Sequence, residues 1–222
     1  MPKSKRAQKV TLAKTQKKGR ARKTTLLDEV RACADLYNSA YVLEAHNMRN
    51  TELKVVRARL SGSRLFFGRT KLLSAALGRT PQEEYRDSLS KVAQALHGRG
   101  EAGLLFTNEP SETVASVLEE TQAHEFARAG TAATRDVDLA AGPLPDFPHN
   151  MEPYLRKLGL PTKLDNGVVT MLAPHVVCRE GAELDSNQAK LLQLLGIKMA
   201  LFKLSVRCRW ASDGEFEAFE DA

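Results

Sequence analysis

The chain has 222 residues, of which 42% are hydrophobic and 27% are charged, and its formal net charge is +6. These proportions are ordinary for a globular protein of one large or two small domains. No apolar run has the length of a membrane span or the pattern of a secretory signal, so we expect neither a membrane protein nor a secreted one. The odd number and wide spacing of the cysteines favour reduced thiols over a disulfide framework or a zinc site, and we expect no metal and no cofactor.

The N-terminal segment is strongly basic. The first 25 residues contain ten Lys or Arg and no carboxylate, which leaves the rest of the chain with a net charge of −4. Like charges repel and large apolar side chains are scarce here, so residues 1–24 are predicted to form a disordered arm that becomes ordered on a polyanion. A solvated tail and a nuclear import signal are the alternative interpretations. The arm's predicted RNA-binding residues are Lys3, Lys5, Arg6, Lys9, Lys14, Lys17, Lys18, Arg20, Arg22 and Lys23.

Apolar periodicity predicts the first folded elements. Positions 26, 30, 33 and 37 share one face of a helix, and residues 41–45 are typical of a short buried strand. A helix capped by Asn50 or Thr51 is expected next, followed by a strand at 64–67. The turn Gly68-Arg69-Thr70-Lys71 then leads into a helix that ends at Gly78. The order is therefore strand, basic turn, helix.

The following segment continues the alternation of helices and strands. Thr80-Pro81-Gln82-Glu83 has the pattern of a helix start with a capping box, so a helix is predicted from Pro81 to Gly98. A strand at 103–106 and a helix capped by Ser111 follow. This alternation predicts an α/β fold in which helices cover a mixed sheet.

The composition changes near residue 126. Gly and Pro become frequent and periodicity weakens, which indicates an inserted, smaller α+β domain. It should contain a short helix at 151–158, a hairpin turn at Asp165-Asn166-Gly167 and a helix from 185 or 186 to 195. Alternation at 202–210 predicts a strand that returns to the first sheet. The predicted domains are the arm at 1–24, an α/β domain at 25–125 plus 200–211, the insertion at 126–199 and a disordered acidic tail at 212–222.

The sequence shows no catalytic set. The histidines are scattered, no phosphate-binding glycine loop or nucleophile elbow is present, and Cys33 and Cys208 fall on apolar faces. The chain is therefore predicted not to be an enzyme.

A group of cations stands out instead. Lys54 and Arg57 project from a predicted helix, and a solvated helix face is the alternative interpretation for them. At Gly68-Arg69-Thr70-Lys71 the glycine allows a close backbone approach. There, amide groups and two cations at a helix N-terminus favour an RNA phosphate. Phe66 and Phe67 are expected in the core rather than stacked on bases.

Ordered motifs along the chain resemble a family of ribosome-assembly factors called mRNA turnover protein four. That family is a relative of the ribosomal stalk-base protein of the eukaryotic P-zero and bacterial L-ten lineage. The resemblance runs from Met1 to about Trp210. Its motifs are Met1-Pro2-Lys3-Ser4-Lys5-Arg6, Thr11-Leu12-Ala13-Lys14-Thr15, Asn47-Met48-Arg49-Asn50, Phe66-Phe67-Gly68-Arg69, Gly103-Leu104-Leu105-Phe106-Thr107-Asn108, Phe126-Ala127-Arg128-Ala129-Gly130 and Leu158-Gly159-Leu160-Pro161-Thr162-Lys163.

The resemblance implies an α/β RNA-binding domain with an inserted domain, which binds large-subunit rRNA at the stalk base without catalysis. It implies a monomeric placeholder among the proteins of pre-60S particles in the nucleus and nucleolus, with shuttling to the cytoplasm on them. A phosphatase-like factor would assist its release before the stalk protein binds. Carried over to this sequence, the rRNA-facing surface comprises the arm, Asn47, Arg49 and the turn Gly68-Arg69-Thr70-Lys71. The turn departs from the family's usual Gly-Lys-Asn-Lys at Arg69 and Thr70.

Two alternative functions are a mature structural ribosomal protein of the stalk base and an mRNA-turnover enzyme. A mature stalk protein continues into helices that seat acidic protein dimers, whereas this sequence stops at Ala222. We therefore expect a protein that binds the rRNA site without building a stalk. In the insertion, the segment 152–157 is either an interaction surface or the solvated side of a helix, and the solvated side is favoured.

Overall fold

The computed structural model describes residues 19–97 and 101–219, so the predicted RNA-binding residues from Lys3 to Lys18 lie outside the described residues. The chain divides into two compact units. Unit 1 comprises Met1–Glu44, Leu60–Pro110 and Val206–Ala222, and unit 2 comprises Ala45–Arg59 and Ser111–Ser205. These bounds differ from the predicted domains, because residues 45–59 and 111–125 cluster with the insertion. The domain bounds stay a prediction.

The largest sheet has six strands in the order β11-β10-β1-β3-β2, with β4 beside β10. β3 is antiparallel to both β1 and β2, and β10 is antiparallel to both β4 and β11. The sheet predicted as mixed thus shows antiparallel pairing in these four pairs. The strands are β1 (Ser39–His46), β2 (Arg64–Phe67), β3 (Ala102–Thr107), β4 (Ala123–Glu125), β10 (Ala200–Ala211) and β11 (Phe216–Ala218).

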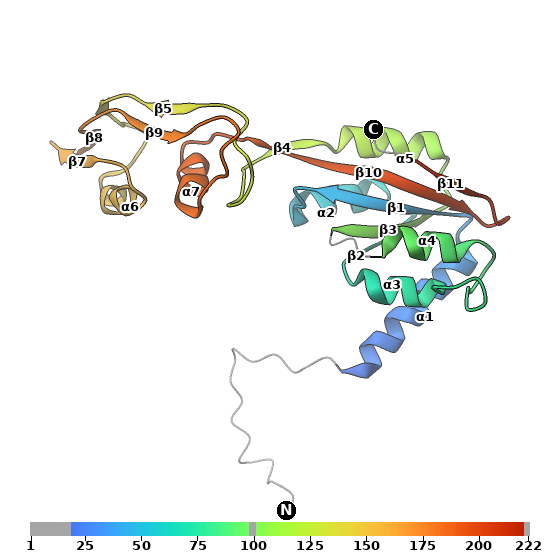
Figure 1. Cartoon of the computed structure of the whole chain (residues 1–222). Coiled ribbons are helices and arrows are strands. Elements are labelled where there is room, and N and C mark those ends of the chain that lie inside the picture. Colours follow the sequence, from blue (N-terminus) through green and yellow to red (C-terminus); the bar gives the residue numbers. More distant parts are fainter. Residues whose placement is uncertain (1–18, 98–100, 220–222) are drawn as a thin grey trace, which may run out of the picture. The chain divides into compact units, whose positions relative to one another are not determined.

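In unit 1, three helices cover one face of the strands: α1 (Arg20–Leu36), α3 (Thr70–Leu77) and α4 (Leu89–Leu96) (Figure 1). Their apolar faces share a single core with β1, β2, β3 and the end of β10. Trp210 is fully buried there, and its indole N–H donates to the carbonyl of Asp87 at 2.8 Å. This core positions α1 and α3, which carry residues predicted to bind RNA.

Both ends predicted to be disordered contain regular structure. α1 begins at Arg20, so Arg20, Arg22 and Lys23 are helical rather than part of a disordered arm. Arg, Lys, Ala and Leu are strong helix formers, and they extend the helix beyond its packed face. In the predicted acidic tail, Phe216–Ala218 forms β11, and the ammonium of Lys91 lies 5.6 Å from the centroid of the Phe216 ring. The apolar contact of Phe216 with the core outweighs the charge repulsion that suggested disorder.

The helix predicted from Pro81 begins only at Leu89, as α4. The residues before it form turns because the chain folds back on α3, so that a Cβ on Gly78 would lie 2.3 Å from the carbonyl oxygen of Glu83. The N–H of Tyr85 also donates to the carbonyl of the last residue of α3 at 2.9 Å. Tertiary contacts here override a local helix-start pattern.

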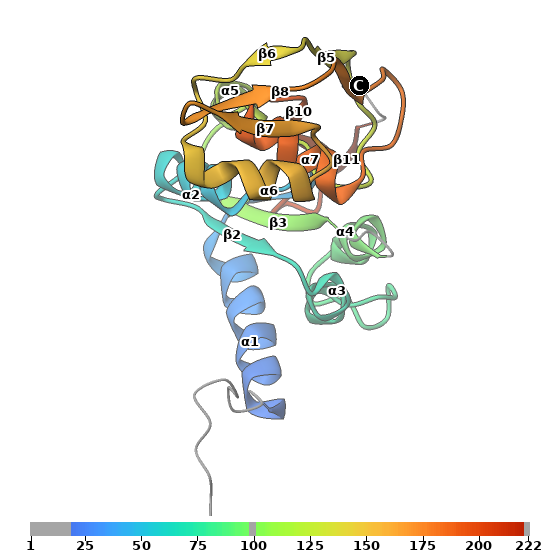
Figure 2. The ribbon, with the colours of Figure 1, turned by 90° about the vertical axis from the view of Figure 1, so that its left-hand side faces the viewer.

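In unit 2, α2 (Asn50–Arg59) packs with α5 (Ser111–Glu120). The insertion holds two small sheets, and α6 lies along β7 (Figure 2). Apolar side chains from these strands and helices form a second core. The elements are β5 (Val137–Leu139) with β9 (His175–Cys178), β6 (Gly142–Pro143) with β8 (Val168–Met171) and β7 (Thr162–Asp165), and the helices η2 (His149–Met151), α6 (Glu152–Lys157) and α7 (Ser186–Leu194).

Two predicted details of the insertion are confirmed. Asn166 and Gly167 both have positive φ, 49° and 83°, as a two-residue hairpin turn requires. Asp185 and Gln188 form a capping box at the start of α7. The α/β fold class with a smaller α+β part is thus confirmed. Among the described residues, no helix combines the length and apolarity needed to cross a bilayer.

Candidate nucleic-acid interface

The first turn of α1 is basic. Arg20, Arg22 and Lys23 lie there without a carboxylate, all three are exposed, and the first buried residue of the helix is Val30. Within residues 19–97 and 101–219, none of the three forms an ion pair. A helix N-terminus already carries partial positive charge, so these cations leave a positive field that an RNA phosphate would neutralise. Figure 2 shows this end of α1 projecting away from the strands of unit 1.

The other end of α1 is held firmly within unit 1. Arg31 Nε donates to the carbonyl of Ala76 in α3 at 3.1 Å. The hydroxyl of Tyr85 donates to the carboxylate of Asp35 at 2.6 Å, and this hydrogen bond raises the pKa of Tyr85. α1 is therefore a positioned helix whose basic end extends beyond the part that is packed.

The turn predicted to bind a phosphate joins β2 to α3. Gly68 and Arg69 both have left-handed backbone, with φ of 77° and 54°, which turns the chain out of the strand. The carbonyl of Arg69 accepts the N–H of Leu72 at 2.7 Å, and α3 begins at Thr70. The first N–H groups of a helix have no intrahelical partner. A Cβ on Gly68 would meet nothing within 4 Å, so this glycine serves its φ and not the predicted close approach.

The cations of this turn are available. Arg69 and Lys71 are exposed, whereas Thr70 is half-buried. In the described part of the chain, neither cationic side chain forms a hydrogen bond or an ion pair. Two unpartnered cations beside helix-start amides are the groups that a phosphate site uses. Behind the turn, Phe66 is 8% exposed and packs edge-on against Phe106, so its predicted core position is confirmed.

In unit 2, the outer face of α2 presents Lys54 and Arg57. Both are exposed, and neither has an ion-pair partner among the residues that the structure describes. Arg59, at the end of the same helix, instead contacts the Glu120 carboxylate at 3.1 Å. The geometry is compatible with a phosphate contact and equally with a solvated helix face.

Asn47 and Arg49 are engaged inside unit 2. The amide of Asn47 donates to the carbonyl of Leu201 at 2.9 Å. The guanidinium of Arg49 donates to the carbonyl of Phe126 and lies 3.9 Å from the carboxylate of Glu125. A phosphate would have to compete with these partners, so the structure gives Arg49 a positioning role next to its predicted RNA contact.

The thiols are not poised for catalysis. Burial raises the pKa of both Cys33 and Cys178, which disfavours the reactive thiolate. Cys208 is buried in the core of unit 1. The candidate residues thus divide into cations at α1 and the β2–α3 turn in unit 1, and a second set on and before α2 in unit 2.

Comparison with known proteins identifies the family. The profile of ribosomal protein L10 matches residues 18–123, and the profile of the insertion domain found in the 60S ribosomal protein of this type matches residues 127–197. The chain is 41% identical to the ribosome assembly factor mrt4 of Schizosaccharomyces pombe, over 96% of this chain and 93% of that protein. It is 36% identical to ribosome assembly factor MRT4 of Saccharomyces cerevisiae, over 96% and 95%. The chain belongs to the Mrt4 family of ribosome assembly factors.

A more distant similarity links the Mrt4 family to a ribosomal protein. Large ribosomal subunit protein uL10 of Thermococcus onnurineus is 28% identical, over 71% of this chain and 46% of that protein. The resemblance inferred from the motifs is therefore confirmed. Mrt4 and L10 proteins are assembly and structural proteins, in agreement with the prediction of a non-enzyme. All candidate RNA-binding residues that the structure describes fall in the segment matched by the L10 profile.

Sequence analysis missed a basic groove in unit 2, lined by Arg128, Lys157 and Lys190 among others. The available signal was the spacing of Ser186, Lys190 and Gln193 at i, i+4 and i+7, which places polar side chains on one face of α7. Arg128 and Lys157 belong to other segments, so no local pattern joins them to that face.

Proposed function

We propose that this protein is a non-enzymatic large-subunit assembly factor that binds pre-60S rRNA at the stalk base and holds the site until the ribosomal stalk protein replaces it. The observation that carries this proposal is the similarity to ribosome assembly factors over 96% of the chain. The L10 profile over residues 18–123 supports the choice of site, because related folds can present related surfaces to the same RNA. That step is an argument by analogy of fold.

Charge supports the RNA contact. The exposed cations at the start of α1 and at the β2–α3 turn have no partners among the described residues. Phosphate contacts of this kind supply affinity, whereas the shape of the folded surface selects the site. The protein would act as a monomer in nuclear and nucleolar pre-60S particles, shuttling with them to the cytoplasm. It would contact other particle proteins, and a phosphatase-like factor would assist its release.

The experiment is a salt titration of RNA affinity. Arg69→Ala and Lys71→Ala should each reduce the slope of log affinity against log salt by roughly 0.7–0.9 on a stalk-base rRNA fragment. Arg135→Ala removes an exposed cation from unit 2 and serves as the matched control. Unchanged slopes, or equal affinity for an unrelated RNA of the same length, would contradict the proposal.

A mature structural ribosomal protein of the stalk base is the second candidate, and the L10 profile is the observation that favours it. The higher identity to assembly factors, 41% against 28%, weighs on the other side. Sedimentation separates the two functions, because an assembly factor should migrate with pre-60S particles and be absent from polysomes.

A further inference from the structure

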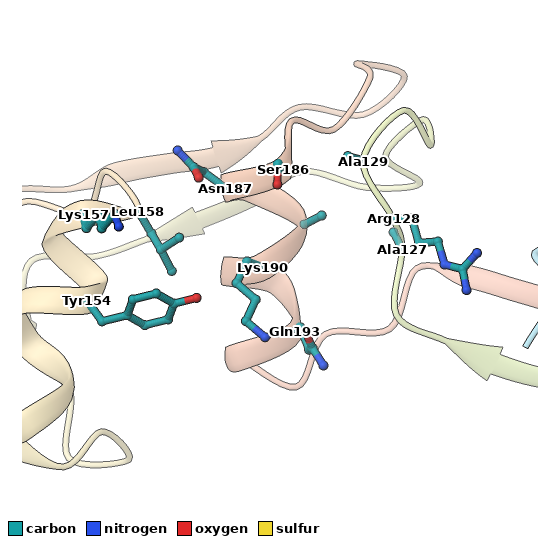
Figure 3. A pocket seen from close by; sticks show the side chains of 11 residues that line it. Ala127, Arg128, Ala129, Tyr154, Lys157, Leu158, Ser186, Asn187, Lys190 and Gln193 are labelled. Carbon is teal, nitrogen blue, oxygen red and sulfur yellow. Dashed lines mark hydrogen bonds between the residues drawn. The ribbon is translucent and has the colours of Figure 1, made fainter. Parts of the chain in front are cut away.

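A groove of about 550 Å³ crosses the exposed face of α7 in unit 2. α7 provides its floor, with Lys190 and Gln193. Tyr154 and Lys157 of α6 stand on one side, and Arg128 lies in the segment on the other side (Figure 3). We propose that this groove binds an acidic segment of a partner protein, with carboxylates on the cations and an apolar side chain between the two helices. This interaction goes beyond rRNA binding and does not depend on it.

The charges of the groove are one-sided. Its lining contains three cations and no carboxylate. In the described part of the chain, Arg128 and Lys157 have no ion-pair partner, and Lys190 Nζ donates only to the neutral amide of Gln193 at 3.0 Å. The nearest acidic residue in sequence, Asp185, is used in the capping box of α7. An acidic ligand would therefore meet cations that no carboxylate of unit 2 neutralises.

Other cations of the insertion contrast with these three. Arg156 contacts Glu152 in the next turn of α6, Lys163 contacts Asp165 at 3.2 Å, and Arg179 contacts two aspartates. The segment 152–157 is thus divided by the structure. Arg156 is engaged in an internal ion pair, whereas Tyr154 and Lys157 line the groove. This division favours an interaction surface over the solvated helix side that the sequence suggested.

The groove also has an apolar part. Ala127, Leu158 and Ala189 line it, and the ring of Tyr154 projects from α6 toward α7 (Figure 3). Tyr154 is 39% exposed, which leaves a large part of the ring open to a ligand. A volume of this size accommodates a few side chains, and a mixed lining suits an acidic peptide that carries one apolar residue.

Net charge favours a protein partner over RNA. From 126 to 199 the sequence has eight Lys or Arg and eight Asp or Glu, so the groove is a small basic site on a neutral segment. RNA binding depends on many cations along a backbone, as in the arm, whereas one or two carboxylates need only a local site. A short acidic segment therefore fits the observed charge distribution better.

The test is fluorescence anisotropy with the full chain at about 0.15 M salt, an ionic strength near physiological. The probe is a labelled peptide of about ten residues that alternates Glu with Leu, a size matched to a groove in the usual range. Because the basic arm also attracts this peptide, the result is the difference between two double variants. Arg128→Glu/Lys157→Glu reverses two charges in the groove, and Arg135→Glu/Lys163→Glu reverses two exposed charges outside it.

We expect the groove variant to bind the peptide on the order of tenfold more weakly than the control variant, because two attractive contacts become repulsive. The Gln-for-Glu version of the peptide should bind both variants equally. Thermal unfolding checks that both variants fold. Equal binding of the acidic peptide to the two variants overturns the proposal. A larger loss for a single-stranded RNA oligonucleotide than for the peptide overturns it as well and assigns the groove to RNA.

Discussion

The Nε atom of Arg49 lies 3.9 Å from a carboxylate oxygen of Glu125 at the end of β4. The same guanidinium donates to the carbonyl of the following residue, Phe126, and the side chain is only 19% exposed. The carbonyl of Arg49 also accepts the N–H of Leu53 at 3.0 Å, in the first turn of α2. Arg49 thus joins the start of α2 to the end of β4 in unit 2, a role that the sequence motif alone did not suggest.

We expect Arg49→Ala to lower the free energy of unfolding by about 1–3 kcal/mol, because it leaves buried hydrogen-bond acceptors without their donor. Lys198, 3.8 Å from Glu125, can compensate in part. Arg57→Ala, on the exposed face of α2, is the matched control and should change stability by less than about 0.5 kcal/mol. Thermal unfolding measures both variants. Equal stability of the two would show that the Arg49 contacts are unimportant.

Gly103 in the central strand β3 permits a close approach of β2. A Cβ at this position would lie 2.7 Å from the carbonyl oxygen of Phe66 and 2.8 Å from two ring atoms of Phe67. We therefore expect Gly103→Ala to destabilise the protein by about 1–3 kcal/mol. Gly62→Ala is the control, since a Cβ there meets nothing within 4 Å. Urea denaturation should separate the two, and similar midpoints would contradict the crowding at Gly103.

Periodicity predicted the elements whose packing is written in their own residues. In β10, Phe202, Leu204, Cys208 and Trp210 are buried, as their alternation indicated, and α3 ends at Gly78 as expected. Prediction failed where the deciding contact is distant in sequence or the element is short. The turns before α4 depend on contacts with α3, and β5 and β6 have too few residues to show a pattern.

The same limit applies to the candidate site. The sequence indicated the exposed cations of α1 and the β2–α3 turn, because charge density is a local property. It could not indicate that Arg49 is occupied, since its partners Glu125 and Phe126 are more than 70 residues away in the chain. Nor could it place Arg128 and Lys190 on one groove, because tertiary packing alone brings their segments together.

The contacts of Asp136 predict a pH dependence. The N–H of Glu180 donates to this carboxylate at 2.7 Å and Arg179 lies 3.1 Å away, and both hold the pKa of Asp136 below its usual value of 3.8. A lowered folded-state pKa contributes stability that is present above the unfolded pKa and is lost as pH falls through the folded pKa. We expect the thermal midpoint to fall below about pH 4, and to fall less in Asp136→Asn.

The control for this pH dependence is Asp146→Asn. Asp146 is exposed and has no hydrogen bond or ion pair within the described ranges. Its variant should therefore lose stability in acid as steeply as the unmodified protein. If Asp136→Asn behaves in the same way, the contacts with Glu180 and Arg179 do not stabilise the folded carboxylate.

The first turn of α1 predicts opposite effects on stability and on binding. Three cations at a helix N-terminus oppose the helix dipole, so Arg22→Gln/Lys23→Gln should stabilise the helix by about 0.3–1 kcal/mol. The same change should weaken binding to stalk-base rRNA and reduce the salt slope by roughly 0.7–0.9 for each phosphate that is no longer neutralised. Circular dichroism and a salt titration measure the two effects on one sample.

The matched comparison is Arg57→Gln in the last turn of α2, where a cation has a favourable interaction with the helix dipole. This variant should be slightly less stable, the opposite sign to the α1 variant. Cations that cost stability and have no internal partner among the described residues are best explained by a ligand of the basic end of α1. If the α1 variant gains no stability, or gains it while binding RNA as tightly as before, then the basic end of α1 has no such ligand and rRNA is held by other parts of the chain.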